Sequence, residues 1–507
     1  MGLAIVNSWA LMGLQSCPVQ VEVHLANGLP SFTLVGLAQG AVKEARERVR
    51  CAIQQSGFDF PSNQRITVNL APSDLPKDSS SFDLPMALGV LAASGQIPLD
   101  TLAACAFSGG LSLAGDLRPV RGALAMRLHA VHQGSSLPWV LPAGSAEEAA
   151  CVPGGPLWRG RHLRDVVAHL RGEPPVDDEA WVQLPSGTGA ARVQPPDTDW
   201  SEVKGQASAK RALEVAAAGQ HSVLLQGPPG SGKTLLAERF VQLLPRMRPD
   251  EALASAALQS LSGQFQLARW GQRPFCRPHH TATAVSLVGG GVPPRPGQAA
   301  LAHLGVLFLD ELPEFDRAAL EALREPLESG FITLSRSRHL AQFPAQFVLV
   351  AAMNPCPCGH LGSSLPCRCT PDQVARYQGK VSGPLLDRVD LQVSVPTQAI
   401  DEVWQAPPGE SSATVQARTE AAWARAWSRQ GKPNRALTVA ELDALPIAVD
   451  AQAALQQAAA RLAWSARAVH RVLRVSRTIA DLQASDRVER HHVAEALQYR
   501  LRQSHAP

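Results

Sequence analysis

HSVLLQGPPGSGKTLLAERF, residues 221–240, is the stretch that decides the fold of this 507-residue chain. An apolar strand over residues 222–226 runs into a glycine-rich loop, and a stretch that favours helix follows directly. This order matches the phosphate-binding pattern G-x-x-x-x-G-K-[ST] in the strand–loop–helix context that the pattern requires. The backbone N–H groups of such a loop and the N-terminus of the helix attract phosphate oxygens. The stretch therefore predicts an α/β nucleotide-binding core.

The loop over residues 227–234 is expected to supply the contacts to ATP and Mg²⁺. Lys233 should reach the outer phosphates, and Thr234 should offer its hydroxyl to the magnesium ion. The other loop residues would surround the phosphates with their backbone: Gly227, Pro228, Pro229, Gly230, Ser231 and Gly232. A chance glycine turn before a helix is the alternative, and the complete motif disfavours it.

Two later apolar strands end in polar side chains. The strand over residues 306–309 ends at Asp310 and Glu311, which would hold the Mg²⁺ shell and polarise the attacking water. Paired acids after a strand are often only a solvated turn, but the P-loop upstream favours catalysis. The strand over residues 347–352 ends near Asn354, whose amide could sense the γ-phosphate, although asparagine there often only forms a turn.

Arg388 follows the third strand, with Asp387 and Asp390 close by. An arginine at this place could complete the ATP site of a neighbouring subunit as a trans-acting finger. The alternative is a local ion pair, which would contribute little to stability. We favour the finger, and it implies that the chain forms a homo-oligomer.

The composition limits the class of protein. The chain is 45% hydrophobic and 18% charged, which is typical of soluble proteins, and its net charge of +3 does not by itself indicate a nucleic-acid partner. No run of about 18 apolar residues occurs, and the first residues lack the basic stretch and apolar core of an export signal. We therefore expect a cytoplasmic protein without a membrane partner.

Changes in composition divide the chain into three predicted domains. Residues 1–170 alternate β-branched runs with alanine-rich helical stretches, which is typical of an α/β domain. Residues 171–199 are rich in Pro, Gly and Asp and are predicted to be a linker. Residues 200–397 hold the nucleotide-binding core, and residues 398–507 show the helical spacing of a small helical domain.

Four of the nine cysteines gather directly after Asn354: Cys356, Cys358, Cys367 and Cys369. Clustered thiols of this kind indicate a metal site rather than the disulfide framework of a secreted protein. The spacing is tight enough for tetrahedral Zn²⁺. Free thiols are the alternative, and His360 could replace one of the cysteines as a ligand. The sequence thus offers a candidate zinc site.

The segment between Glu251 and Asp310 contains no carboxylate, and it is the first candidate DNA-binding region. Its cationic and aromatic residues alternate, which suits phosphate contact and base stacking. The proposed phosphate contacts are Arg269, Arg273 and Arg277, with Arg295 in the same segment and Phe265, Trp270, Phe275, His279 and His280 interleaved. A basic loop that packs on a neighbouring subunit is the alternative.

A second candidate DNA contact is the pair Arg336 and Arg338. Residues 331–334 and 346–350 are β-prone and could frame a hairpin that carries the pair. Two residues at positions i and i+2 of a strand share one face. The alternative interpretation, which the sequence supports nearly as well, is that the two arginines lie at a solvated hairpin tip.

The order of these motifs resembles that of AAA+ ATPases, and five stretches narrow the resemblance. They are RPFCRPHH at 273–280, VGGG at 288–291, LAHLGVLFLDELPE at 301–314, NPCPCG at 354–359 and GPLLDR at 383–388. Together they are similar to the YifB/ComM family of magnesium-chelatase-like AAA+ proteins. The similarity extends over nearly the whole chain.

This resemblance implies a hexameric ring that uses ATP to move single-stranded or branched DNA. The implied activity is branch migration in homologous recombination during natural transformation. The resemblance assigns Lys233, Thr234, Asp310, Glu311, Asn354 and Arg388 the roles given above. It also implies a C-terminal helical lid in which Arg467 is a second sensor, with Arg471 one helical turn away as the alternative. A chelatase-like or chaperone-like ring that remodels a protein partner is the competing interpretation.

The N-terminal domain resembles the Lon-protease-like fold, but it lacks that enzyme's catalytic pair. KDSSSFD, residues 77–83, lies where the protease keeps its nucleophilic serine. The position of the catalytic lysine is occupied by Leu124, which cannot deprotonate a serine. We therefore expect a domain without proteolytic activity.

Overall fold

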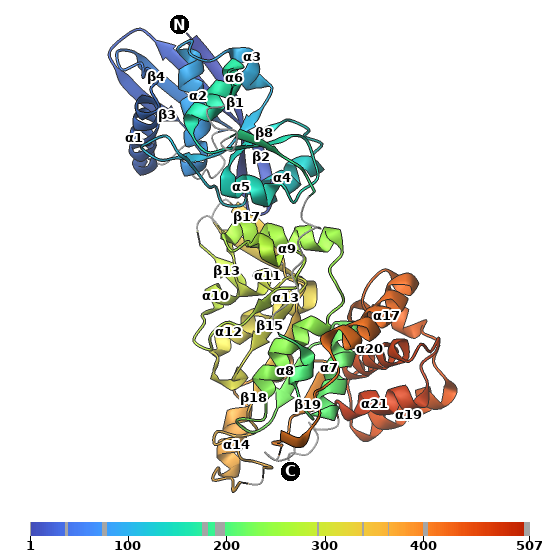
Figure 1. The fold of residues 1–507 in the computed structure, drawn as a ribbon. Helices are drawn as coiled ribbons and strands as arrows, with labels where there is room; N and C mark the ends of the chain where they lie inside the picture. The colour runs from blue at the N-terminus through green and yellow to red at the C-terminus, as the bar shows by residue number, and fades with distance from the viewer. Residues whose placement is uncertain are drawn as a thin grey trace.

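The computed structural model describes residues 2–35, 39–72, 79–174, 181–187, 198–291, 294–336, 339–363, 365–398 and 404–500. An N-terminal α/β region, a central α/β region and a C-terminal helical region follow one another (Figure 1). The central region lies between the other two. None of the helices in the described part of the chain is long and apolar enough to cross a membrane.

The N-terminal region is built on an eight-stranded mixed sheet. Its strands in spatial order are β10 (Trp181–Leu184), β9 (Leu157–Gly160), β8 (Trp139–Pro142), β5 (Ala106–Phe107), β1 (Gly2–Met12), β2 (Gln15–Ala26), β4 (Arg65–Ala71) and β3 (Ser31–Val35). The main helices packed around it are α1 (Gln39–Gln55), α2 (Asp83–Ala93), α4 (Ala123–His132), α5 (Ala143–Ala149) and α6 (Leu163–Arg171). Helix α2 is apolar on all sides and is buried from Asp83 to Ala92, so it forms the centre of this core.

The structure differs from the predicted 171–199 linker at one segment. Strand β10 pairs antiparallel with β9, with Trp181 opposite Gly160. Trp181 also stacks on Trp158, with ring centroids 5.4 Å apart. Residues 181–184 therefore belong to the N-terminal sheet, and the boundary predicted at residue 170 lies too early. The alternating apolar and polar residues of WVQL were the available signal.

The central region is a parallel sheet, as the sequence predicts. Its strands in spatial order are β12 (Phe275–Cys276), β15 (Val306–Leu309), β18 (Val348–Met353), β11 (Val223–Gln226) and β19 (Leu391–Ser394). Every neighbouring pair is parallel. The strands β15 and β18 are buried throughout, which explains their continuous apolar sequence. All five carboxyl ends therefore meet at one edge of the sheet.

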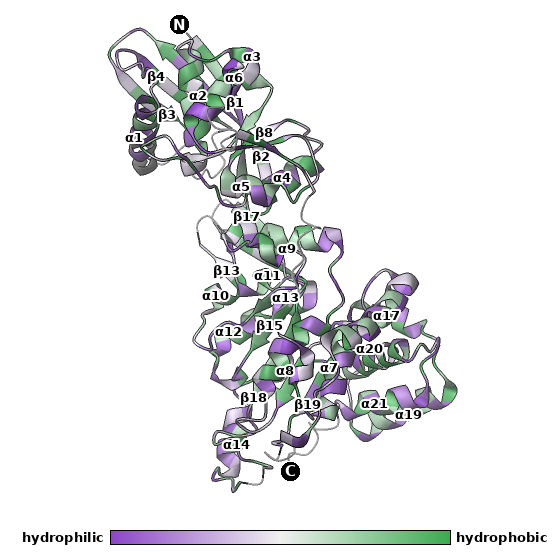
Figure 2. Ribbon diagram, viewed as in Figure 1, coloured by the Kyte–Doolittle hydropathy of each residue, from purple (hydrophilic) through white to green (hydrophobic). Residues whose placement is uncertain are grey.

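The helices of the central region are α7 (Ala207–Gly219), α8 (Lys233–Phe240), α9 (Pro249–Ser262), α10 (Ala284–Val288), α11 (Gln298–Leu301), α12 (Arg317–Ala322), α13 (Arg324–Ser329), α14 (Pro371–Gln378) and α15 (Gly383–Leu386). Figure 2 shows the central strands coloured mainly hydrophobic, whereas the outer helices carry both hydrophobic and hydrophilic residues.

A hairpin precedes β18, but its second arm differs from the prediction. Strand β16 (Phe331–Arg336) pairs with β17 (His339–Pro344), from Phe331 opposite Pro344 to Arg336 opposite His339. The predicted second arm, residues 346–350, instead leads into β18 of the parallel sheet. The physical reason is burial, because residues 348–353 are buried on both faces as a central strand requires.

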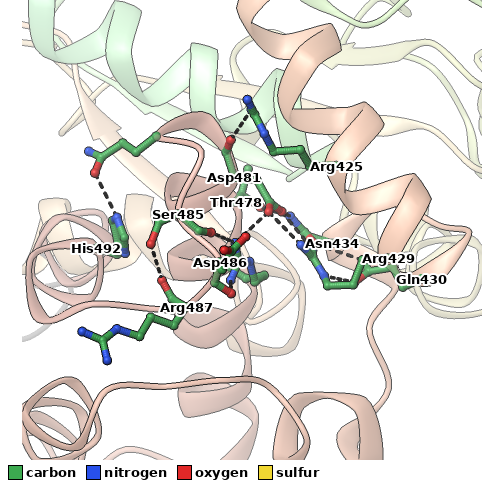
Figure 3. A network of polar contacts seen from close by, with 12 residues as sticks. Arg425, Arg429, Gln430, Asn434, Thr478, Asp481, Ser485, Asp486, Arg487 and His492 are labelled. Carbon is green, nitrogen blue, oxygen red and sulfur yellow. Dashed lines mark hydrogen bonds and ion pairs between the residues drawn. The ribbon is translucent and has the colours of Figure 1, made fainter.

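The C-terminal region is helical, as predicted. It contains α17 (Ser412–Gln430), α18 (Val439–Asp443), α19 (Val449–Arg461), α20 (Ala466–Leu482) and α21 (Arg490–Gln498). A buried polar network joins α17 to α20 (Figure 3). Asp481 accepts hydrogen bonds at 2.8 Å from Arg429, Asn434 and Arg477. The carboxylate thus balances two arginines inside the helical packing.

The N-terminal region docks on the central region through apolar contacts, of which the largest joins two helices. Helix α4 packs against α9, with Leu124 and Ala125 facing Ala252 and Ala256 in one buried cluster. The backbone N–H of Gly122 also donates to the carbonyl of Ser260 at 3.1 Å. The contact fixes how the two α/β regions meet.

Candidate active site

Glycines shape the phosphate-binding loop after β11. Gly230 and Gly232 have φ values of +74° and +88°, a left-handed conformation that glycine adopts without steric cost. At Gly227 a Cβ atom would lie 2.1 Å from the carbonyl oxygen of Val395 in the segment after β19, so a larger residue does not fit. Helix α8 begins directly after the loop, at Lys233. The loop is therefore built to turn its backbone toward a ligand at the start of this helix.

Lys233 connects the loop to the third predicted element of the site. Its Nζ donates to the carbonyl oxygens of Gly227 and Pro228, each at 2.8 Å, and to Oδ1 of Asn354 at 3.2 Å. Burial lowers the pKa of Lys233. Phosphate oxygens could replace the two carbonyls as partners of the ammonium group, because both kinds of oxygen accept hydrogen bonds. The predicted sensor Asn354 thus lies within reach of the phosphates.

Thr234 and Asp310 meet as a magnesium site requires. The Thr234 hydroxyl donates to Oδ2 of Asp310 at 3.1 Å. A hydroxyl and a carboxylate beside a phosphate site are the oxygen donors that Mg²⁺ prefers, so these residues fit the ion. Glu311 follows with φ of +52°, which is uncommon outside glycine and is found at functional sites. Its side chain is 57% exposed and stays accessible to water.

Two residues of the predicted DNA segment also lie in this site. Nη2 of Arg277 is 2.8 Å from Oδ2 of Asp310, and its Nη1 is 3.2 Å from Oε1 of Glu238. Nδ1 of His280 is 3.3 Å from Oε2 of Glu311. Topology brings these residues here, because β12 pairs with β15 and residues after either strand emerge at the same sheet edge. The Arg277 side chain is 44% exposed, and DNA contact by Arg277 stays a prediction.

Comparisons with known proteins agree with this geometry. The family described as magnesium chelatase, subunit ChlI, matches residues 199–403, and related descriptions of the same subunit match residues 21–144 and 409–500. The competence protein ComM of Haemophilus influenzae is 45% identical over 99% of this chain and 98% of its own length. The uncharacterized proteins YifB of Salmonella typhimurium and Escherichia coli are each 44% identical over 99% of this chain and 97% of their own length.

The chain belongs to the YifB/ComM family of magnesium-chelatase-like AAA+ proteins. Membership indicates an ATPase that uses a nucleotide and Mg²⁺. The meeting of Lys233, Thr234, Asp310 and Asn354 at one sheet edge is consistent with that activity.

Other residues of the segment 251–310 have structural roles in this member of the YifB/ComM family. The Arg273 side chain is only 4% exposed, and it donates to the carbonyl of Leu304 at 2.6 Å and lies 3.5 Å from Glu251. Trp270 is buried in the contact between α4 and α9. The predictions that Arg273 contacts DNA and Trp270 stacks on bases are therefore wrong, because this part of the segment packs inside the protein. Arg269 is exposed.

The second DNA candidate is only partly described. Arg336 is the last residue of β16, and the description there covers its backbone alone. Arg338 lies outside the described residues. DNA contact by this pair stays a prediction.

Arg388 pairs within its own chain. It contacts the carboxylate of Glu328 on α13, and its Nη1 donates to the carbonyl of Pro384 at 2.6 Å. The side chain is 10% exposed. The sequence offered a local ion pair with a flanking aspartate as the alternative, whereas the carboxylate partner here is Glu328, 60 residues earlier in the chain. A role of Arg388 in a neighbouring subunit stays a prediction.

The two second-sensor candidates on α20 differ in their surroundings. Arg467 is exposed, whereas the Arg471 side chain is mostly buried, with Nε 3.9 Å from Oδ1 of Asp390. The sequence places Asp390 close to Arg388, but its carboxylate faces Arg471 in the structure. It also accepts the backbone N–H of Ser222 at 3.1 Å. Although burial opposes it, contacts with His221 and Arg471 lower the pKa of Asp390 to about 2, so an ionised carboxylate anchors α20 to the sheet.

The four clustered cysteines form a compact group of thiols. Their sulfur atoms all lie within 4.8 Å of one another, and Sγ of Cys356 is 3.5 Å from that of Cys358 and 3.7 Å from that of Cys367. Tetrahedral zinc with Zn–S bonds of about 2.3 Å would separate its sulfurs by about 3.8 Å. Backbone hydrogen bonds from His360 and Arg368 lower the pKa of Cys358, which favours the metal-binding thiolate. The group therefore fits zinc.

The cysteine loop contacts the phosphate-binding loop directly. A Cβ atom on Gly359 would lie 2.4 Å from Cδ of Pro229, so the two backbones pass each other closely. The loop leads to α14, at the end of the molecule opposite the N-terminal region (Figure 1). This position connects the candidate metal site to the candidate active site.

The counterpart of the Lon-protease site is occupied by structural contacts. The buried carboxylate of Asp83 accepts hydrogen bonds from Nε and Nη2 of Arg48, at 2.7 and 3.2 Å. Leu124 is fully buried where α4 meets α9. Lys77 and Asp78 lie outside the described residues. The Leu124 position thus serves domain packing.

Proposed function

We propose that the chain is an ATP-dependent DNA motor, a hexameric ring that drives branch migration in homologous recombination during natural transformation. The observation that carries the ATPase part is the convergence of Lys233, Thr234, Asp310 and Asn354 at one sheet edge. Similarity to a competence protein over nearly the whole chain supports the DNA part.

In the proposed reaction the loop backbone and Lys233 bind the phosphates of ATP. Thr234 and Asp310 hold Mg²⁺, which neutralises phosphate charge when it is bound. Glu311 accepts a proton from the attacking water, and Asn354 orients the outer phosphate beside Lys233. Arg467 acts from the helical lid as the second sensor, with Arg471 as the alternative. Each group acts from a fixed backbone position, so the site is pre-organised for phosphoryl transfer.

The ring would bring Arg388 to the ATP site of the adjacent subunit. Its guanidinium forms an ion pair with Glu328 of the same chain, so action in trans requires that this ion pair breaks. Glu328 is 54% exposed and Arg388 is 10% exposed, so opening the pair would move the arginine out of a mostly buried position. ATP hydrolysis would then depend on contact between subunits.

The proposal includes a pocket on the described surface as a site for the DNA backbone. This pocket of about 350 Å³ lies between the N-terminal and central regions. Arg121 comes from the first region and Arg295 from the second, and the described residues of its lining include no carboxylate. Both arginines are exposed. These two arginines and the exposed Arg269 are the proposed phosphate contacts, and DNA contact by Arg336 and Arg338 remains part of the proposal.

A protein-remodelling ring is the second candidate function, because the matched family is named for a chelatase subunit. Salt-dependent DNA binding separates the two. The motor should bind single-stranded and forked DNA with an affinity that falls steeply with salt, because phosphate contacts release counterions. Arg121→Glu and Arg295→Glu should each weaken binding about tenfold or less, roughly the effect of losing one phosphate contact.

Arg461→Glu is the matched control, since Arg461 is an exposed arginine on α19 far from this pocket. ATPase activity that is independent of DNA, without DNA binding at low salt, would favour the remodeller.

A bound zinc ion is part of the proposal. Cys356, Cys358, Cys367 and Cys369 would hold it, and its structural role would be to fix the loop between Asn354 and α14.

A further inference from the structure

Arg277 bridges two carboxylates of the candidate active site. Its two terminal nitrogens contact Asp310 at 2.8 Å and Glu238 at 3.2 Å. Its guanidinium also lies over the Phe308 ring, 5.5 Å from the ring centre. Two of these three partners lie on or directly after β15, and the third lies on helix α8. Together they hold the Arg277 guanidinium beside Asp310, the acid that would bind magnesium.

The contact involves the same atom that the ion needs. Oδ2 of Asp310 accepts the Thr234 hydroxyl at 3.1 Å and faces Nη2 of Arg277 at 2.8 Å. Mg²⁺ requires a near-octahedral shell of oxygen atoms at about 2.0–2.1 Å and usually keeps several waters. A guanidinium against Oδ2 takes up space in that shell and already neutralises the carboxylate. Arg277 and the ion are therefore alternatives at Asp310.

We propose that Arg277 holds the place of Mg²⁺ beside Asp310 when no nucleotide is bound, and that the two cations exchange there in each round of ATP binding. This inference rests on the proposed ATPase function. Glu238 gives Arg277 a partner to keep after the exchange, because its carboxylate is not among the expected magnesium ligands. Arg277 thus acts as a positioning residue for the acid pair.

The same short segment also restrains the second acid. His280 follows Arg277 by three residues, and its ring lies against that of His279, tilted by 35° with centroids 4.1 Å apart. Its Nδ1 is 3.3 Å from Oε2 of Glu311. Movement of Arg277 away from Asp310 would therefore also shift the contact that holds Glu311. The exchange would couple binding of the ion to release of the catalytic base.

The test is Mn²⁺ binding to the full chain with a non-hydrolysable ATP analogue, followed by electron paramagnetic resonance. This readout does not depend on hydrolysis. Arg277→Gln should bind Mn²⁺ about two- to fivefold more tightly than wild type, the range for removing one partly exposed ion pair. Arg376→Gln, which removes an exposed arginine of α14, is the matched control and should leave the affinity unchanged.

Arg277→Lys keeps the charge but loses the planar fork that reaches two carboxylates, so its affinity should lie between those of wild type and Arg277→Gln. Equal or weaker Mn²⁺ binding by a folded Arg277→Gln overturns the exchange. If that variant does not fold, an Arg277→Lys affinity equal to wild type overturns it. Failure of wild type to bind the analogue overturns both the ATPase proposal and this inference, whereas normal binding with no effect of Arg277 overturns the inference alone.

Discussion

Asp310 is the single residue on which the candidate active site converges. One of its oxygens faces Thr234 and Arg277, and the other accepts the backbone N–H of Glu311 at 3.1 Å. A substitution there would disturb binding of the ion, the arginine and the local turn together. Glu311 is the better position at which to separate catalysis from structure, because its side chain is 57% exposed and contacts His280, which is itself partly exposed.

Asp481 is the residue in the helical region whose loss should be most costly. Its side chain is 1% exposed and balances Arg429 and Arg477. We expect Asp481→Asn to lower the free energy of unfolding by about 3 to 5 kcal/mol, because two arginines would keep their charge inside the packing. Urea-induced unfolding followed by circular dichroism measures the loss.

The pH dependence has a defined sign. Although burial opposes it, Arg429 and Arg477 lower the pKa of Asp481 in the folded protein. Its stabilisation should therefore be present at neutral pH and disappear as the pH falls through the acid range. Asp486→Asn is the control, since that exposed residue enters the network only through its backbone carbonyl. Equal stability of the two variants would contradict the account.

At the scale of elements, the cysteine loop makes a metal-dependent prediction. Purified wild type should carry about one zinc ion per chain, and Cys367→Ser should carry far less, because three thiolates bind zinc more weakly than four. Elemental analysis measures the content. Cys51→Ser removes a thiol from α1, outside the cluster, and should keep the metal. Near-zero zinc in both wild type and Cys367→Ser would rule out the site.

The same loop should affect the ATP site. Gly359 packs against Pro229, so a loop loosened by zinc loss would no longer hold the phosphate-binding loop from this side. ATP affinity should therefore fall in Cys367→Ser and stay normal in Cys51→Ser.

Elements explain what the sequence could predict about the site. Residues 227–234, Asp310 and Asn354 each follow an apolar strand of four or six residues, and the carboxyl ends of parallel strands share an edge. Arg277 follows β12, a strand of only two residues, which gives no periodic signal. Its place beside Asp310 could not be inferred from the charge pattern.

Burial explains the other differences. Arg273 is enclosed because backbone carbonyls of Leu304 and Pro245 accept its hydrogen bonds, and such partners leave no mark in a sequence. The absence of carboxylates between Glu251 and Asp310 suggested an exposed basic surface. Part of that segment is instead the packing between α4 and α9.

At the scale of the whole molecule, the N-terminal region contributes Arg121 to a pocket that is lined otherwise by the central region. Its helix α4 is joined to α9 by an apolar contact, and Arg121, next to that contact, lines the pocket with Arg295. The nucleotide site is at the other end of the central sheet region, beside α8 (Figure 1). If DNA is held at this pocket, a conformational change caused by ATP hydrolysis would have to pass through the central region to reach it.

Branch migration of synthetic four-way DNA by the purified full chain tests the central claim most directly. Wild type with ATP and Mg²⁺ should convert the substrate. Lys233→Ala should abolish conversion through loss of ATP binding, and Glu311→Gln should retain ATP and DNA binding but turn over at least about a hundredfold more slowly, the scale of a lost general base. Conversion that survives in Lys233→Ala, or that wild type cannot perform, would contradict the account.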